Sequence, residues 1–513
     1  MTRPPNTELV LASGAAALLA ALHRELYSRW EELNDGLNPT PTEFPSRFIP
    51  DYQAAAPPTE LPGRRAELIV EASDPQAVQA ALASGARALV LDFDDTFAPS
   101  LANVQAAYAA LPELIAAVAR NGQALLLRPR ALYAAEPHLS APETGGGPAV
   151  AALCDLAAVL SARPERPLPT YLPKLETVAQ AQFWDDALSL IERRLGWPPD
   201  SVPVCLQIET WPGLLGADEL LYTLRRRAYG LNAGRWDYVF SLVKTLGVKT
   251  LGVKTVGVKT LGRQSGLRPL PTRAELSMDQ DSMRAYAETL LRVAQRRGAQ
   301  AIGGSAALSI DPANPQVALN RVQADKRREA QQGFTAAWAG SPALLGAVEA
   351  GFAGVQAAPL PPEAPQRTLE RLLALPASET LPLHDVQDAI GLALDVFAAW
   401  YAGRGVIVRK RSTEDPATTE DPATTEDTAT TEDTATAELA RAQLWQWLSC
   451  RAGLSTGEPF TPERYLEERR AQRPDAAPES RLLDELVLAP GCAAYFPRAA
   501  QALAQADVLE KRP

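Results

Sequence analysis

Two neighbouring stretches of the sequence decide the fold: Pro203-Val-Cys-Leu-Gln-Ile-Glu-Thr-Trp-Pro212 and Gly230-Leu-Asn-Ala-Gly-Arg-Trp-Asp-Tyr238. Each reads as a short apolar strand that ends in polar residues, and residues 217–229 between them have the apolar spacing of a helix. A strand, a helix and a second strand in this order indicate two parallel strands. Because consecutive parallel strands are neighbours, Glu209 and Asp237 are predicted to converge at one end of the sheet.

The same alternation of short apolar runs and helical patterns extends over a large part of the chain. The other runs that read as buried strands are Ala88–Phe93, Ala124–Arg128, Thr170–Lys174, Ala299–Gly303 and Ala336–Ala339. Six or more such units favour an α/β fold of the TIM (β/α)₈ barrel type over an open sheet. Polar residues stand at the C-terminal ends of these runs, where barrel enzymes carry their chemistry: Asp92, Asp94, Arg128, Lys174 and Glu209.

Segments on both sides of the predicted barrel read mainly as helices. The run Leu9–Leu22 is rich in Ala and Leu but is followed at once by charges, so we interpret it as an amphipathic helix and not as a signal or membrane segment. A proline-rich coil, Phe44–Pro62, then leads to a short strand and a helix. From about Thr380 the chain becomes helical, with apolar 3.6-residue spacing in Asp385–Tyr401 and Ala435–Leu448.

Charge and cysteine usage narrow the class of protein. The 513 residues carry a formal net charge of −11, which argues against general nucleic-acid binding and against binding to an anionic membrane. The four cysteines are far apart and lack Cys-x-x-Cys spacing, so we expect neither a disulfide framework nor a thiolate metal site, and we expect a reducing, cytoplasmic compartment. With only three histidines, a His-based zinc site is not expected. The oligomeric state is left open.

The predicted pair of carboxylates suits a divalent cation. Mg²⁺ prefers oxygen ligands and keeps open positions for water and substrate, so Glu209 and Asp237 could hold it at the barrel mouth. Gly234 would let a small anion approach the backbone N–H groups that precede Asp237. On spacing alone, ion pairing of both carboxylates with nearby arginines is an equally good interpretation.

Two internal repeats interrupt the barrel pattern. The pentapeptide Val-Lys-Thr-Leu-Gly runs four times over 243–262, and a hexapeptide beginning Thr-Glu-Asp runs four times over 413–436. Neither period matches a known solenoid, and four short copies cannot bury a core. We interpret both as duplications in surface loops.

Several segments resemble one enzyme family. The stretch from Gly230 to Leu246 looks like the signature of the malate synthases in their short (A-type) form. Other segments are also similar to that family and occur along the chain in the same order as in the family: Leu91–Pro99, Leu127–Leu132, Tyr171–Glu176, Met283–Tyr286, Arg297–Gly304 and Asp433–Trp447. Because these matches are long and ordered, they form a more specific signal than a single short motif.

The resemblance implies a domain plan and a reaction. The family fold is a TIM barrel with an N-terminal helical clasp and a C-terminal helical plug, which would correspond to residues 1–85, 86–380 and 381–513. The family reaction is the condensation of acetyl-CoA with glyoxylate and water, giving malate and CoA in the glyoxylate cycle. The partners implied are therefore small-molecule substrates, with Mg²⁺ as the cofactor.

The resemblance also implies roles for particular residues. The Mg²⁺ ligands of the family fall on Glu209 and Asp237, its active-site arginine on Arg128 and its catalytic aspartate on Asp433. Asp433 would remove a methyl proton from the thioester, and Arg128 would stabilise the resulting enolate. The backbone N–H groups that would hold the glyoxylate carboxylate are those of Gly234, Arg235 and Trp236.

The hexapeptide repeat offers four candidates for the catalytic base, Asp415, Asp421, Asp427 and Asp433. Asp433 alone runs directly into the predicted C-terminal helix in the register of the family, so we expect Asp433 to be the base.

Two other functions remain open at this point. One is a malyl-CoA or citryl-CoA lyase, a related barrel enzyme that cleaves a C–C bond without hydrolysing the thioester. The other is a non-catalytic barrel scaffold whose site has been disabled by the loop repeats. Release of CoA from acetyl-CoA plus glyoxylate would distinguish the synthase from both.

Overall fold

The computed structural model describes residues 8–35, 41, 43–59, 61, 63–140, 142–162, 166–246, 262–263, 266–267, 269–375, 380–410, 429–493 and 495–510. Most of the pentapeptide repeat and the hexapeptide copies that contain Asp415, Asp421 and Asp427 lie outside these residues. The chain divides into two compact units. The first comprises Met1–Arg235, Glu288–Ala306 and Leu319–Pro362, and the second comprises Trp236–Ala287, Ala307–Ala318 and Glu363–Pro513.

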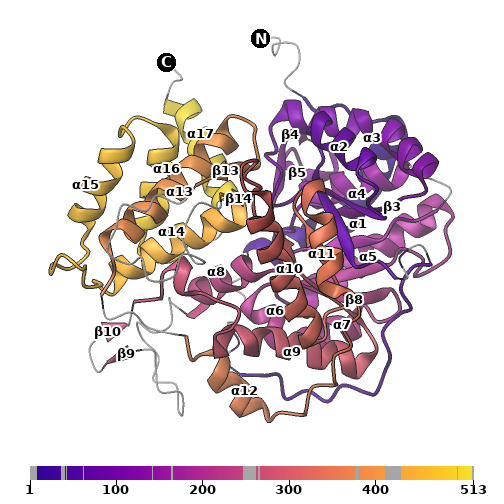
Figure 1. The fold of residues 1–513 in the computed structure, drawn as a ribbon. Helices are drawn as coiled ribbons and strands as arrows, with labels where there is room; N and C mark the ends of the chain where they lie inside the picture. The colour runs from indigo at the N-terminus through magenta and orange to yellow at the C-terminus, as the bar shows by residue number, and fades with distance from the viewer. Residues whose placement is uncertain are drawn as a thin grey trace. The chain divides into compact units, whose positions relative to one another are not determined.

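The first unit is built on a barrel of parallel strands (Figure 1). Within the described residues the barrel strands are β1 (Ala66–Glu71), β2 (Ala88–Asp92), β3 (Ala124–Arg128), β6 (Thr170–Leu172), β7 (Val204–Ile208), β8 (Ala228–Ala233), β11 (Gln300–Ala306) and β12 (Ala336–Ala339). They close in the order β1-β12-β11-β8-β7-β6-β3-β2. The predicted TIM barrel is therefore confirmed.

The strands read as continuous apolar runs because both of their faces are buried. Every residue of β2, β3, β7 and β8 is buried. One hydrophobic cluster draws buried side chains from seven of the strands, including Val90, Leu126, Tyr171, Ile302 and Trp338. These side chains fill the barrel interior, as in other closed eight-stranded barrels.

Helices connect and cover the strands of the first unit. They are α1 (Ser13–Asp35), α2 (Pro75–Ala83), α3 (Leu101–Asn121), α4 (Ala151–Ser161), α5 (Val178–Leu195), α6 (Trp211–Leu215), α7 (Ala217–Thr223) and α11 (Leu345–Phe352), with a hairpin of β4 (Ala135–Ser140) and β5 (Pro148–Val150). The predicted N-terminal helix is thus present as α1, which packs against α4 and α5. Among the described residues, α3 is long and apolar enough to cross a membrane, but in this fold it links β2 to β3.

Three helices contain residues of both units: α8 (Arg235–Leu246), α9 (Asp281–Arg297) and α10 (Pro315–Gln332). The second unit is otherwise mainly helical, with α12 (Pro365–Leu372), α13 (Leu383–Tyr401), α14 (Thr434–Ser449), α15 (Pro462–Gln472), α16 (Pro478–Val487) and α17 (Phe496–Glu510). Its short strands are β9 (Gly262–Arg263), β10 (Gly266–Leu267), β13 (Ile407–Arg409) and β14 (Thr430–Glu432). The two C-terminal helices predicted from apolar spacing are confirmed as α13 and α14.

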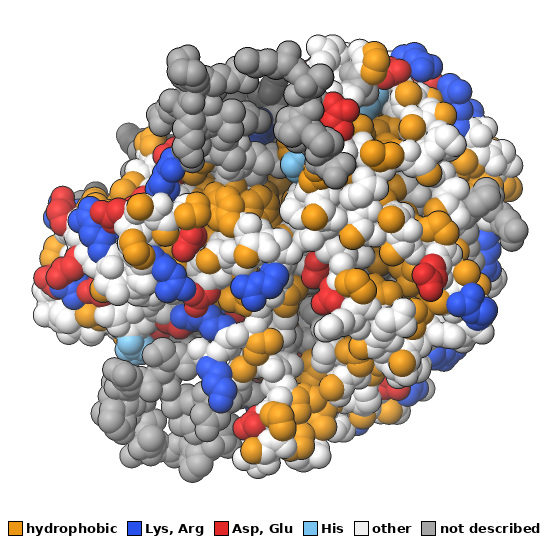
Figure 2. Space-filling view, turned by 90° about the horizontal axis from the view of Figure 1, so that it is seen from above, with side chains coloured by type: hydrophobic (Ala, Val, Ile, Leu, Met, Phe, Trp, Pro, Cys, Tyr) orange, Lys and Arg blue, Asp and Glu red, His pale blue; other side chains and the backbone are white. Residues whose placement is uncertain are grey.

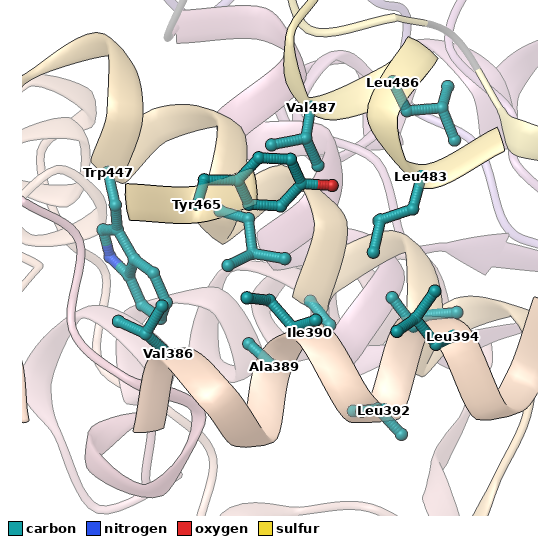
Figure 3. Packing of buried hydrophobic residues seen from close by; sticks show 14 of the residues in the cluster. Val386, Ala389, Ile390, Leu392, Leu394, Trp447, Tyr465, Leu483, Leu486 and Val487 are labelled. Atoms are coloured by element: carbon teal, nitrogen blue, oxygen red, sulfur yellow. The ribbon is translucent and has the colours of Figure 1, made fainter. Parts of the chain in front are cut away.

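The second unit has its own hydrophobic core (Figure 3). Val386 of α13 lies beside Trp447 of α14, and Ile390 of α13 lies under the ring of Tyr465 of α15. Leu483 of α16 belongs to the same cluster. These side chains are almost completely buried. The 3.6-residue spacing seen in the sequence therefore corresponds to helix faces that pack on one another.

The structure corrects three details of the sequence prediction. The barrel takes its first strand, β1, from the range 1–85 that was assigned to a clasp, because β1 pairs with both β12 and β2. The helix predicted over 217–229 ends at Thr223, because residues 228–233 form β8 between β7 and β11. Asp237 consequently lies in the first turn of α8 and not at a strand end.

Candidate active site

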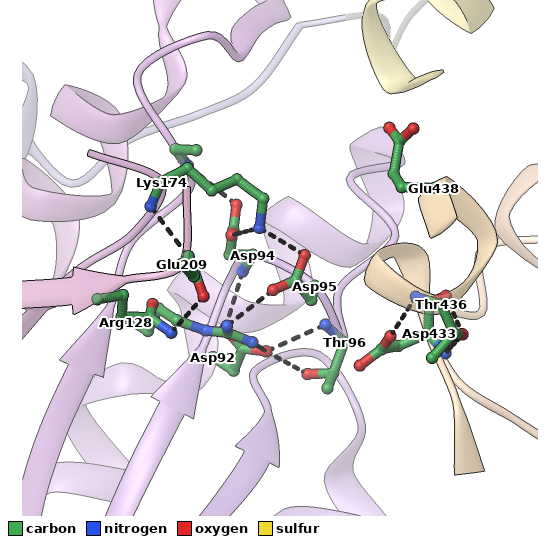
Figure 4. Close-up of polar contacts among 12 residues, drawn as sticks. Asp92, Asp94, Asp95, Thr96, Arg128, Lys174, Glu209, Asp433, Thr436 and Glu438 are labelled. Carbon is green, nitrogen blue, oxygen red and sulfur yellow. Dashed lines mark hydrogen bonds and ion pairs between the residues drawn. The ribbon is translucent and has the colours of Figure 1, made fainter. Parts of the chain in front are cut away.

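Charged side chains gather at the C-terminal ends of consecutive barrel strands (Figure 4). The cations are Arg128, the last residue of β3, and Lys174, which follows β6. The carboxylates are Asp92 at the end of β2, Asp94 and Asp95 just after it, and Glu209 just after β7. All six residues are buried. We call this group the carboxylate cluster.

Arg128 is held rigidly by two aspartates. Its Nε and Nη2 donate to the two carboxylate oxygens of Asp92 at 2.5 and 2.6 Å, and its Nη1 donates to Asp95 at 2.9 Å. The guanidinium carbon also lies 5.0 Å from the ring centroid of Trp338. These contacts use three of the five guanidinium N–H groups and fix the plane of the fork, which leaves a positive charge of defined orientation at the barrel mouth.

Asp92 is itself fully engaged, and this anchors the arginine. Besides Arg128, it accepts the backbone N–H of Asp94 at 2.9 Å and both the N–H and the hydroxyl of Thr96, at 3.1 and 2.5 Å. The turn after β2 therefore folds around this carboxylate, in the way that Asp side chains stabilise turns.

Lys174 links the aspartates to Glu209. Its Nζ donates to Asp94 at 2.8 Å and to Asp95 at 2.7 Å, and its backbone N–H donates to Glu209 at 3.0 Å. Its φ is +53°, a left-handed conformation that is uncommon for residues other than glycine. The sequence placed Lys174 only at a strand end, and its joint contact with three carboxylates is visible only in the structure.

The carboxyl of Glu209 is difficult to ionise in this environment. Burial raises its pKa to about 7, and Asp95 and Asp94 add to the increase, while Lys174 and Arg128 oppose it. Burial likewise raises the pKa of Asp94. With every group ionised, the carboxylate cluster holds four negative and two positive charges. Its net charge is therefore −2, and two further positive charges would neutralise it.

A glycine makes room for Glu209. A Cβ placed on Gly234 would lie 2.2 Å from Glu209 Oε2 and 2.8 Å from Glu209 Cβ, so any other residue at position 234 would displace this side chain. The sequence suggested that Gly234 allows an anion to approach the backbone. The structure adds a second reason, the close packing of Glu209 against the loop after β8. Arg235 follows Gly234. Its positive charge helps to lower the pKa of Asp325 in α10 and opposes the rise that burial causes in the pKa of Glu329.

The remaining predicted site residues belong to the second unit. Trp236 and Asp237 lie in the first turn of α8, where the helix dipole favours a carboxylate, and Asp237 is 5% exposed. Asp433 is the N-cap of α14 (Figure 4). Its Oδ1 accepts the Thr436 N–H at 3.2 Å, and its own N–H donates to the Thr436 hydroxyl at 3.0 Å. This capping box fixes the aspartate at the head of the helix.

The structure thus brings Arg128, Glu209 and Gly234 together within the first unit, with Lys174, Asp94 and Asp95 as additional members. In the described part of the chain, no group of three or more His, Cys, Asp or Glu side chains is arranged to hold a metal ion by itself.

Comparison with known proteins places these residues in a family. The family model described as malate synthase, TIM barrel domain, matches residues 125–360. A malate synthase of Streptomyces clavuligerus is 31% identical over 504 residues, which cover 89% of this chain and 86% of that protein. Malate synthase A of Escherichia coli is 29% identical over 447 residues, covering 80% and 75% of the two chains.

A solved structure is also similar at a lower level. The Haloferax volcanii malate synthase in a pyruvate/acetyl-CoA ternary complex has 16% sequence identity and a TM-score of 0.46, covering 74% of this chain and 90% of that one. The similarity to the Streptomyces clavuligerus protein extends over the barrel and well beyond it, and the chain therefore belongs to the malate synthase family.

Proposed function

We propose that this chain condenses acetyl-CoA with glyoxylate and water to give malate and CoA, with Mg²⁺ held by Glu209 and Asp237. The observation that carries the metal assignment is the carboxylate cluster. It lacks two positive charges, and burial holds the pKa of Glu209 near 7. A divalent cation beside Glu209 would offset both effects, and carboxylate oxygens are the ligands that Mg²⁺ prefers.

Bound Mg²⁺ would supply Lewis-acid polarisation of the glyoxylate aldehyde oxygen. The chain would then hold the substrate carboxylate through the backbone N–H groups of Gly234, Arg235 and Trp236. These groups belong to the end of β8 and the start of α8, and the N-terminus of a helix favours an anion. This placement would present the aldehyde carbon to its attacking partner in one orientation.

Asp433 would act as the general base on the other substrate. Its carboxylate would take a proton from the methyl group of acetyl-CoA, leaving an enolate whose carbon attacks the aldehyde. The capping box with Thr436 fixes the backbone and one carboxylate oxygen, so the base would meet the methyl group without a prior conformational search.

Arg128 would stabilise the negative charge that develops on the thioester oxygen. Its guanidinium is already oriented by Asp92 and Asp95, so no reorganisation is needed when the charge appears. Hydrolysis of the malyl-CoA formed by the attack would then release CoA and make the overall reaction favourable.

The comparisons do not favour the two alternative functions. The relatives named above are malate synthases, and their match continues beyond the barrel. A malyl-CoA or citryl-CoA lyase would leave the thioester bond unhydrolysed and would release no free CoA from it. A non-catalytic scaffold would have no need of the buried charges at the strand ends.

We also propose a cytoplasmic location and small molecules as the binding partners. The four cysteines are free thiols, which fits a reducing cytoplasm. On the face shown in Figure 2, the Lys and Arg side chains are interspersed with Asp and Glu over the described residues. Together with the formal net charge of −11, this face favours small-molecule substrates over a nucleic acid or an anionic membrane as partners.

The deciding experiment is a thiol assay of CoA release from acetyl-CoA and glyoxylate, with Mg²⁺ and with EDTA. We expect Mg²⁺-dependent release of one CoA per malate. Formation of malyl-CoA without free CoA would favour the lyase, and absence of any turnover with Mg²⁺ would contradict the proposed function.

A further inference from the structure

Two of the segments that carry proposed site residues lie within the second unit and are joined by one arginine. Arg273 begins the short 3-10 helix η2 (Arg273–Glu275). Its Nη1 donates to both carboxylate oxygens of Glu432, each at 2.9 Å. Its guanidinium carbon lies 5.0 Å from the ring centroid of Trp236. Trp236 immediately precedes Asp237, and Glu432 immediately precedes Asp433.

The segment before Arg273 is fastened to the helix that Asp433 caps. The backbone N–H of Leu270 donates to Gln446 at 2.9 Å, and the Trp447 indole donates to the Leu270 carbonyl at 2.9 Å. Gln443 donates to the Pro271 carbonyl at 2.7 Å. Three side chains of α14 therefore hold residues 270–271, so the position of Arg273 is set by the same helix.

The strand before Asp433 is paired along both of its edges. On one edge β14 pairs with β13, with Glu432 opposite Ile407. On the other edge, the Thr431 N–H donates to the Ala307 carbonyl at 2.7 Å and the Ser309 N–H donates to the Ala429 carbonyl at 2.8 Å. The backbone is thus fixed, and the Glu432 side chain, 2% exposed, requires a cation that Arg273 supplies.

We propose that Arg273 is a positioning residue for the reaction: it holds the first turn of α8, with Asp237, in register with the end of β14, with Asp433. The proposal rests on the proposed function for the roles of these two aspartates. A planar guanidinium suits this task because it can donate to a carboxylate in its plane and stack on an indole with its face. A lysine ammonium offers the charge without the plane.

The test compares Arg273→Gln and Arg273→Lys with the wild type by two measurements. The first is the isotope effect on kcat with acetyl-CoA that carries a deuterated methyl group. The second is Mg²⁺ affinity, measured by calorimetry without substrates. In Arg273→Gln we expect kcat to fall about 10- to 100-fold and the isotope effect to rise, because a misplaced Asp433 slows C–H cleavage.

Mg²⁺ affinity in Arg273→Gln should fall about 10-fold, because the turn that carries Asp237 loses its support. Arg273→Lys should lie between Arg273→Gln and the wild type in both measurements. The matched control is Arg371→Gln in the same unit, which removes ion pairs to Glu363 at 3.1 Å and Asp281 at 2.9 Å and should change neither quantity.

Unchanged isotope effect and unchanged Mg²⁺ affinity in Arg273→Gln would overturn the positioning role. If Arg273→Gln does not fold, Arg273→Lys decides by the same two measurements. Failure of the proposed function is a separate result, seen as absence of CoA release by the wild-type protein. In that case the Mg²⁺ titration of the variants would still test whether Arg273 positions the turn that carries Asp237.

Discussion

Substitution of Gly234 by alanine tests the geometry of the site most directly. The added Cβ would lie 2.2 Å from Glu209 Oε2, 2.8 Å from Glu209 Cβ and 3.2 Å from Glu209 Cδ. Nonbonded contacts between heavy atoms are normally about 3.5 Å or longer, so the Glu209 carboxylate must move by about 1 Å. Rotation of the side chain alone cannot relieve the contact with its own Cβ, so the backbone of the strand end or of the loop must shift as well.

A displacement of this size has a predictable effect on catalysis. Misplacement of a catalytic group by about 1 Å typically reduces the rate about 100-fold, which corresponds to about 2.7 kcal/mol of transition-state stabilisation. We therefore expect kcat/KM of Gly234→Ala to fall by about two orders of magnitude, with a parallel loss of Mg²⁺ affinity because Glu209 is a proposed ligand. Steady-state kinetics and calorimetric Mg²⁺ titration measure the two effects, and circular dichroism checks that the variant is folded.

A matched glycine provides the control. Gly346 lies in α11, and a Cβ placed there meets nothing within 4 Å. Gly346→Ala should keep wild-type activity and gain up to about 1 kcal/mol of stability from helix propensity. If folded Gly234→Ala retained wild-type kcat/KM and Mg²⁺ affinity, the assignment of Glu209 to the metal site would be refuted.

Three further predictions follow from the site. Asp433→Asn should abolish turnover while Asp415→Asn should not; full activity of Asp433→Asn in the CoA-release assay would exclude it as the base. Lys174→Met should lower stability by about 3–5 kcal/mol and remove activity, because Asp94 and Asp95 lose a buried cation. The control Arg227→Met, which breaks a buried ion-pair group at the start of β8, should lower stability only. Thermal unfolding measures the loss of stability, and kcat of the folded protein measures the loss of activity. Because the pKa of Glu209 is raised to about 7, its contribution to the stability of the metal-free protein is full below its unfolded pKa and is lost as pH rises through about 7. Mg²⁺ binds the ionised carboxylate, so Mg²⁺ affinity should fall about 10-fold per pH unit below 7. Calorimetry that shows no proton release on Mg²⁺ binding would contradict this.

The sequence by itself determined the barrel and most of its strands. Buried parallel strands must be apolar on both faces, and this local requirement is visible as runs such as Ala124–Arg128 without knowledge of their partners. The start of α14 at Asp433 was equally accessible, because a capping box involves residues only three positions apart. Polar residues at strand ends indicated where the site would lie.

Only the tertiary structure decided which groups meet and how strongly they interact. Lys174 and Asp94 are separated by 80 residues, and Arg273 and Glu432 by 159, and no local pattern relates their side chains. The sequence also predicts a helix up to residue 229, whereas β8 begins at Ala228. Pairing of β8 with β7 and β11 overrides the helical pattern of these residues. The raised pKa of Glu209 has the same origin: it depends on burial and on charges brought from other strands, and these exist only once the barrel has closed.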